Sequence, residues 1–221
     1  MEYKSIIFDL DGTLIESTAN HIDWIYKCCE EALEAQKVDK TISKEDLGKL
    51  LGMDGYRNYI SVCNKIGVDP AKHWEIVTEL RHQKKLEMLN ENELDLYPET
   101  EKIIKNLHDQ DLKIGLVSNS PDKTVNEIID FFDLKRYIEY YRGISDHEDL
   151  NHRKPSARNL KIASTEISRA PYVYVGNKKE DIKAAEKANM DSIIVERSNT
   201  GLDADPDILV ESLSDILSRL N

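Results

Sequence analysis

Two hydrophobic patterns alternate along much of the chain. Short apolar runs rich in β-branched residues, each followed at once by polar or small residues, are typical of buried strands that end in a loop. Between these runs, apolar residues recur every three or four positions, which is typical of helices. The predicted strands are 5–10, 112–118, 137–141, 172–175 and 192–195, and the helices between and after them are 99–107, 121–132, 155–163, 179–188 and 213–220.

This alternation predicts an α/β fold, a doubly wound parallel sheet of Rossmann-like type with right-handed crossovers. Residues 15–94 differ, because they show helical spacing without strand-like alternation, and four helices are expected there. The first strand precedes this block and the other strands follow it. We therefore expect an α-helical domain at 15–94 inserted into an α/β core domain made of 1–14 and 95–221.

Composition and charge narrow the possible partners. The 221 residues are 40% hydrophobic and 33% charged, as in globular proteins. With 30 Lys and Arg against 42 Asp and Glu, the net charge is −12, which repels nucleic acids and anionic membranes. We expect neither as a partner. A phosphorylated substrate would need a local cation, either a metal ion or a placed Lys or Arg.

The cysteines and the amino-terminal residues favour a reducing compartment. The three cysteines, Cys28, Cys29 and Cys63, form no metal-binding spacing and no obvious disulfide framework. The apolar run Ile6–Phe8 is much shorter than the core of a signal peptide or a membrane span. The sequence therefore predicts a cytoplasmic protein.

Polar residues follow three of the predicted strands. Asp9 and Asp11 belong to the end of the first strand and its loop, Ser118 and Asn119 end the second, and Asn177 with Asp181 follows the strand at 172–175. In open parallel sheets, ligands bind beyond the carboxyl ends of the strands. These residues are therefore expected to share one edge of the sheet.

The pair Asp9 and Asp11, with Gly12 permitting a turn, suits phosphoryl transfer. A carboxylate beside a divalent cation can attack phosphorus, and a second carboxyl can protonate the leaving oxygen. Asp and Gly also favour ordinary turns, so the run alone leaves both interpretations open. Ser118 supplies a hydroxyl, and Ser120 is expected to cap the following helix, whose free N–H groups favour an anion.

Two further segments add possible ligands. Lys154 stands at the predicted opening of a helix, where a positive charge is unfavourable, which suggests a use for it, although a solvated surface lysine is the common alternative. The segment 176–181 offers oxygen ligands that could complete a Mg²⁺ site with the Asp9 carboxylate and a main-chain carbonyl near Asp11.

Four segments in this order resemble the motifs of the haloacid dehalogenase superfamily, in particular its phosphohydrolases with a helical cap, such as the phosphoglycolate phosphatase and β-phosphoglucomutase types. The segments are Ile6–Leu14 (IIFDLDGTL), Leu116–Asn119 (LVSN), Lys154–Pro155 and Val175–Ile182 (VGNKKEDI). The resemblance covers nearly the whole chain and makes the helical block the cap.

The resemblance implies a Mg²⁺-dependent phosphatase that hydrolyses a small phosphorylated metabolite through an aspartyl-phosphate. Asp9 would be the nucleophile, Asp11 the general acid that later activates water, and Gly12 and Thr13 would support the loop. The implied phosphate-binding residues are Ser118, Asn119 and Lys154. The implied metal ligands are Asp9, Asp11, Asn177 and Asp181. The protein would be a monomer or a homodimer.

One position departs from the family pattern. The fourth motif usually begins Gly-Asp, whereas this chain has Gly176-Asn177, so one negative charge is lost. A phosphate-binding protein with weak or lost turnover is therefore one alternative, and a phosphomutase of the β-phosphoglucomutase type is another. Residues of the cap are expected to select the substrate, and the candidates are His21, Lys49 and Arg57.

Overall fold

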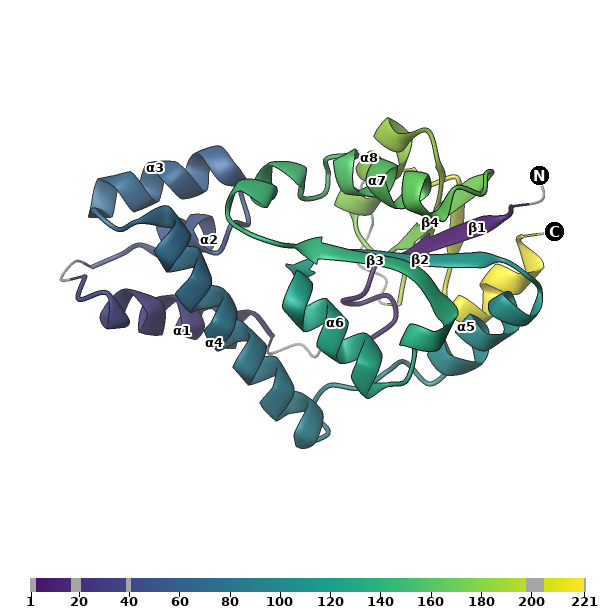
Figure 1. Ribbon diagram of the computed structural model, residues 1–221, viewed down its shortest axis with the longest axis horizontal. Coiled ribbons are helices and arrows are strands. Elements are labelled where there is room, and N and C mark those ends of the chain that lie inside the picture. Colours follow the sequence, from purple (N-terminus) through teal and green to yellow (C-terminus); the bar gives the residue numbers. More distant parts are fainter. Residues whose placement is uncertain (1–2, 17–20, 39–40, 198–204, 221) are drawn as a thin grey trace. The chain divides into compact units, whose positions relative to one another are not determined.

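The computed structural model of the protein describes residues 3–16, 21–38, 41–197 and 205–220 (Figure 1). The chain divides into two compact units. The first unit comprises residues 1–16, 95–143 and 152–221, and the second comprises residues 17–94 and 144–151. The sequence predicts an α/β domain at 1–14 and 95–221 and a helical domain at 15–94.

The first unit is built on one six-stranded sheet, in the order β3-β2-β1-β4-β5-β6. The strands are β1 (Ser5–Phe8), β2 (Lys113–Pro121), β3 (Ile138–Ile144), β4 (Tyr172–Gly176), β5 (Asp191–Val195) and β6 (Ile208–Val210). Strand β1 is central and pairs in parallel with β2 and β4, and β4 with β5 and β5 with β6 are also parallel. The predicted parallel sheet is confirmed, but the sequence analysis missed β6, which has only three residues.

Helices cover both faces of this sheet, with α7 and α8 on one face and α5 and α6 on the other (Figure 1). Their bounds are α5 (Thr100–Asp109), α6 (Asp122–Phe131), α7 (Arg158–Ile167) and α8 (Lys179–Ala188), and 3-10 helices occupy Lys135–Tyr137, Glu148–His152 and Leu213–Ser218. The helix expected at 213–220 is thus a 3-10 helix that ends at Ser218. Buried Leu160 of α7 and Ala184 of α8 pack with Ile7 and Tyr174 of the sheet.

The register of the central strands brings distant parts of the sequence together. Phe8, the last residue of β1, pairs with Leu116 of β2 on one side and with Val175 of β4 on the other. The residues that follow these three positions therefore lie at the same edge of the sheet, although β2 itself continues to Pro121. Asp9 and Asn177 directly follow β1 and β4, and Ser118 lies in β2 just beyond its pairing with β1.

The second unit consists of helices α1 (His21–Ala35), α2 (Lys44–Leu50), α3 (Tyr56–Ile66) and α4 (Pro70–Asn90), with residues 144–151. Its core includes Tyr59 and Trp74, whose rings meet edge to face at 5.8 Å between centroids. None of the described helices has the length and apolar character that a bilayer span requires.

Residues 144–151 depart from the predicted domain boundary, because the sequence analysis assigned them to the α/β domain. Ile144 and Leu150 are buried in the core of the second unit. Gly52 has a φ of +72° and lies so close to Leu150 and Trp74 that a side chain at this position would collide with them. This segment is therefore part of the packing of the helical unit.

Candidate active site

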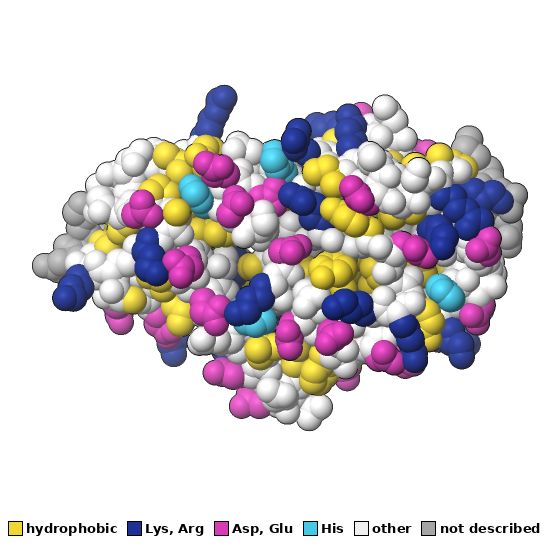
Figure 2. Space-filling view, viewed as in Figure 1, with side chains coloured by type: hydrophobic (Ala, Val, Ile, Leu, Met, Phe, Trp, Pro, Cys, Tyr) yellow, Lys and Arg dark blue, Asp and Glu magenta, His cyan; other side chains and the backbone are white. Residues whose placement is uncertain are grey.

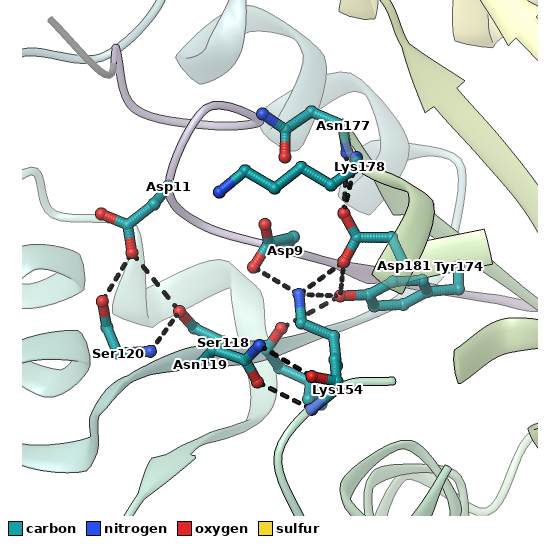
Figure 3. Close-up of polar contacts among 11 residues, drawn as sticks. Asp9, Asp11, Ser118, Asn119, Ser120, Lys154, Tyr174, Asn177, Lys178 and Asp181 are labelled. Atoms are coloured by element: carbon teal, nitrogen blue, oxygen red, sulfur yellow. Dashed lines mark hydrogen bonds and ion pairs between the residues drawn. The ribbon is translucent and has the colours of Figure 1, made fainter. Parts of the chain in front are cut away.

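Asp9 lies at the centre of a polar cluster beyond the carboxyl end of β1 (Figure 3). Its main-chain N–H donates to the carbonyl of Val175 at 2.8 Å, which continues the pairing with β4. Its buried carboxylate contacts the ammonium of Lys154, with 2.7 Å between Oδ1 and Nζ. Burial raises the pKa of Asp9 to about 6, and the charge of Lys154 opposes that rise. Asp9 is thus held in a buried ion pair with Lys154.

The Lys154 ammonium is held from three directions. Besides Asp9, it donates to Oδ1 of Asp181 at 2.6 Å and to the hydroxyl of Tyr174 at 2.7 Å. Burial acts to lower the pKa of Lys154, but the charges of Asp181 and Asp9 outweigh it, so the pKa lies above its ordinary value. Asn119 fixes the main chain of Lys154: its Oδ1 accepts from the Lys154 N–H at 2.8 Å, and its Nδ2 donates to the carbonyl at 3.2 Å.

Asp181 organises the start of α8. Its Oδ2 accepts the main-chain N–H groups of Asn177 and Lys178 at 3.0 and 2.9 Å, while Oδ1 receives Lys154. The carboxyl group lies against the α-carbon of Gly176, where any side chain would collide with it. Both carboxylate oxygens are thus engaged, and Asp181 joins the strand end, the helix and Lys154.

Asp11 lies on another side of the cluster, next to the end of β2 (Figure 3). Its Oδ2 accepts the hydroxyl of Ser120 at 2.6 Å and that of Ser118 at 3.5 Å, and Ser118 Oγ in turn accepts the Ser120 N–H at 3.0 Å. The expectation that Ser120 caps the next helix is wrong, because α6 begins at Asp122 after Pro121 without a side-chain cap. Ser120 instead orients Asp11.

The turn after Asp11 packs against the loop before α8. Gly12 has a φ of +82°, and its α-carbon lies against the side-chain amide of Asn177, so only glycine fits. Thr13 is fully buried, and its hydroxyl has no partner among the described residues. The side-chain oxygen of Asn177, Oδ1, is also buried and unpartnered within the described part of the chain. A buried unsatisfied acceptor of this kind is costly unless a ligand completes it.

The oxygen atoms around Asp9 are better suited to bind a hard divalent cation than a transition metal. Among the described residues, no three His, Cys, Asp or Glu side chains are grouped to hold a metal. Mg²⁺ needs only one or two carboxylates and completes its octahedral shell with water or phosphate oxygens. The orphaned Asn177 Oδ1 and the Asp9 carboxylate supply suitable oxygens, whereas both Asp181 oxygens are occupied by protein donors.

Three residues of this cluster were not predicted from the sequence as part of the site, although Ser120 was expected as a helix cap. Tyr174 is fully buried in β4, and besides meeting Lys154 it donates its hydroxyl to the carbonyl of Val117 at 3.2 Å. Burial raises the pKa of Tyr174 well above its ordinary value. Lys178 and Ser120 are the other two. A buried tyrosine between two valines, and a lysine directly beside Asn177, were the available signals.

The three candidates for substrate selection lie in the second unit. Lys49 forms ion pairs with Glu45 at 2.6 Å and with Asp46 at 3.4 Å, so its ammonium is already paired with acids of the same helix. Arg57 is exposed near the start of α3. The side chain of His21 lies outside the described residues. The selection role of all three stays a prediction.

Comparison with known proteins gives relatives along the whole chain. The family model described as haloacid dehalogenase-like hydrolase matches residues 6–195. The pyrophosphatase PpaX of Oceanobacillus iheyensis is 24% identical over 99% of this chain and 97% of its own length. A phosphoglycolate phosphatase of Salmonella typhi is 22% identical over 98% of this chain and 92% of its own.

Solved structures share the fold. CbbY from Rhodobacter sphaeroides, crystallised in complex with phosphate, is 18% identical and superimposes with a TM-score of 0.73 over 97% of this chain and 96% of that one. A hydrolase from Ehrlichia chaffeensis, also 18% identical, superimposes with a TM-score of 0.59 over 99% of this chain and 96% of its own. These likenesses support the architecture seen in Figure 1.

Proposed function

Because the chain belongs to the haloacid dehalogenase-like hydrolase family, we propose that it is a Mg²⁺-dependent phosphatase acting on a small phosphorylated metabolite through an aspartyl-phosphate. The observation that carries this proposal is the meeting of the buried Asp9 with Lys154 and with the Asp11 loop at one edge of the sheet. Relatives named for phosphoglycolate and pyrophosphate support a small anionic substrate.

The proposed reaction has two displacements at phosphorus. A carboxylate oxygen of Asp9 forms a bond to phosphorus while the bond to the leaving oxygen breaks, and Asp11 gives its proton to that oxygen. Asp11 then takes a proton from a water molecule, which attacks the phosphorus, releases inorganic phosphate and restores the Asp9 carboxylate. Ser120 and Ser118 hold the Asp11 side chain ready for both proton transfers.

The residues that would hold the metal are the Asp9 carboxylate, the main-chain carbonyl of Asp11 and Oδ1 of Asn177. When bound, Mg²⁺ would supply positive charge that screens the two approaching anions and stabilises charge on the transferring oxygens. Asp181, predicted as a ligand from the sequence, is proposed here to act by fixing the loop that presents Asn177, because both of its oxygens already accept hydrogen bonds.

Release of inorganic phosphate tests this function. The substrates are p-nitrophenyl phosphate, phosphoglycolate and pyrophosphate, each with Mg²⁺, and the proteins are the wild type, Asp9→Asn and the exposed helix variant Asp130→Asn as a matched control. We expect turnover by the wild type and the control, and a loss of about 1,000-fold or more in Asp9→Asn. Full activity of Asp9→Asn would overturn the assignment of the nucleophile.

The neutral Asn177 favours one second candidate, a protein that binds phosphate but has lost turnover. Two measurements separate the two functions. A phosphate-binding protein without turnover would bind inorganic phosphate in a calorimeter, but it would release no phosphate from any substrate in the assay above. A phosphomutase would instead rearrange a sugar phosphate without releasing an equivalent amount of free phosphate. Sustained release of phosphate with Mg²⁺ supports the hydrolase.

A further inference from the structure

The ammonium of Lys154 lies between Asp9 on one side and a pair of residues on the other (Figure 3). Its contact with the Asp9 carboxylate is 2.7 Å, and opposite lie Oδ1 of Asp181 at 2.6 Å and the hydroxyl of Tyr174 at 2.7 Å. These two oxygens are 3.3 Å apart. A protonated lysine has three N–H bonds, so two of them anchor the ammonium and the third points toward Asp9.

The hydroxyl of Tyr174 is a fixed point for this ammonium. The tyrosine side chain is fully buried, and it packs in the core with Leu160 of α7 and Ala184 of α8. Its main chain is paired with Ile7 of β1. The lysine side chain has far more rotational freedom than a packed aromatic ring. Tyr174 therefore restrains the end of Lys154, and not the reverse.

The same hydroxyl also reaches the strand that carries Ser118. Its proton faces the carbonyl of Val117 at 3.2 Å, and Val117 directly precedes Ser118. Burying a hydroxyl is costly unless it is hydrogen-bonded, and the partners of this one, Lys154, Asp181 and the Val117 carbonyl, all lie at the cluster around Asp9. The ring thus fills the core, whereas the hydroxyl contributes to the site.

We propose that Tyr174 is a positioning residue for phosphate binding, whose hydroxyl fixes the ammonium of Lys154 so that its remaining N–H meets the phosphoryl oxygens beside Asp9. This inference rests on the proposed function, since it assigns a role within the same site. Lys154 keeps the phosphate-binding role expected from the sequence, and Tyr174 acts through it without touching the substrate. Without the hydroxyl, Asp181 alone would anchor the ammonium, and a less well-oriented donor stabilises the reacting group less.

Two tyrosines on β4 allow a matched test. Tyr174→Phe removes the hydroxyl and keeps the ring. Tyr172→Phe removes a hydroxyl that instead donates to the main-chain carbonyl of Ser164 at 2.7 Å, outside the cluster. Tyr174→Met, whose flexible side chain can refill the buried space, gives a second protein that lacks the hydroxyl.

Turnover of p-nitrophenyl phosphate with Mg²⁺, and its competitive inhibition by inorganic phosphate, measure the effect at a temperature where melting curves show each protein to be folded. A hydrogen bond to a charged group contributes enough that losing it costs about tenfold or more. We expect kcat/KM to fall, and the inhibition constant of phosphate to rise, by at least about tenfold in Tyr174→Phe and Tyr174→Met. In Tyr172→Phe both constants should stay within about twofold of the wild type.

A merely structural role would lower the melting temperature without changing these two constants. Wild-type values of both constants in Tyr174→Phe or Tyr174→Met therefore overturn the role of Tyr174 and leave the phosphatase function standing. Equal losses in Tyr172→Phe also overturn it, because the effect would then not depend on contact with Lys154. A wild type that releases no phosphate from the ester overturns the proposed function, and the role of Tyr174 with it.

Discussion

At the scale of single residues, the neutral side chain of Asn177 distinguishes this site. Its Oδ1 is buried and has no hydrogen-bond partner among the described residues, so this atom is available to a ligand such as a cation, which an amide oxygen binds weakly. We predict that Asn177→Asp binds Mg²⁺ at least about tenfold more tightly, equivalent to about 1.4 kcal/mol, because a carboxylate adds a full negative charge beside the cation. Titration calorimetry with MgCl₂ measures this change.

The control for that variant is Asn189→Asp, the same substitution at the exposed end of α8. It alters the net charge of the protein equally without touching the cluster, so its affinity for Mg²⁺ should match that of the wild type. Equal Mg²⁺ affinity in Asn177→Asp and Asn189→Asp would remove Asn177 from the proposed metal site.

At the scale of elements, Asp181 connects β4, α8 and Lys154 through both of its oxygens. Asp181→Asn removes a buried charge that faces Lys154 and disturbs the hydrogen bonds at the start of α8. Breaking a buried ion pair on one side costs about 3–5 kcal/mol, and we predict a loss of this size in the free energy of unfolding, measured with urea. Glu186→Gln, which neutralises an exposed acid on the same helix, should change it by less than about 0.5 kcal/mol.

We predict that a buried histidine makes the stability of the helical unit depend on pH. Burial lowers the pKa of His73 on α4 to about 4, and its Nδ1 lies 2.9 Å from Nε2 of Gln36. Since the unfolded chain binds this proton near pH 6.5 and the folded chain near pH 4, the stabilising effect of neutral His73 is complete above pH 6.5 and declines as the pH falls toward 4. The loss is on the order of 3 kcal/mol.

Urea unfolding at pH 7 and pH 5 measures this effect in the wild type, in His73→Gln and in His108→Gln, which replaces a half-exposed histidine. Glutamine at position 73 keeps an acceptor for Gln36 but does not titrate. We expect the decline between pH 7 and pH 5 to shrink in His73→Gln and to persist in His108→Gln. The same decline in all three proteins would contradict a role for His73.

Elements and motifs were predictable to different degrees. Helix α8 has the predicted bounds, 179–188, because a polar loop and an alanine-rich amphipathic run mark both of its ends. Strand β6 has too few residues for a periodic signal. The place of residues 144–151 depends on contacts such as that between Leu150 and Gly52, which join positions about a hundred residues apart and leave no trace in local periodicity.

The site shows the same contrast. The strand-end pattern predicted that residues from β1, β2 and β4 would meet, and the register of those strands brings them to one edge. The pattern did not reveal which donors are already used: the three bonds of Lys154, the two oxygens of Asp181 and the link from Ser120 to Asp11 are properties of side-chain geometry.

At the scale of the whole molecule, the net negative charge of the protein contrasts with the local positive charge that a phosphate site needs. The net charge is −12, and on the face drawn in Figure 2 acidic and basic side chains are interspersed. Such a field does not attract polyanions. Under the proposed function, a small phosphorylated metabolite would be held by local cations and hydrogen-bond donors at the edge of the sheet, so a few residues would determine its recognition.

The central claim is that Asp9 accepts the phosphoryl group, and rapid acid quenching tests it most directly. The enzyme is mixed with Mg²⁺ and a substrate carrying a radiolabelled phosphoryl group, quenched in acid during turnover, and digested for peptide mapping. The account predicts label on the peptide that contains Asp9 and none in Asp9→Asn. Label on a different side chain, or turnover during which no label attaches to the protein, would contradict it.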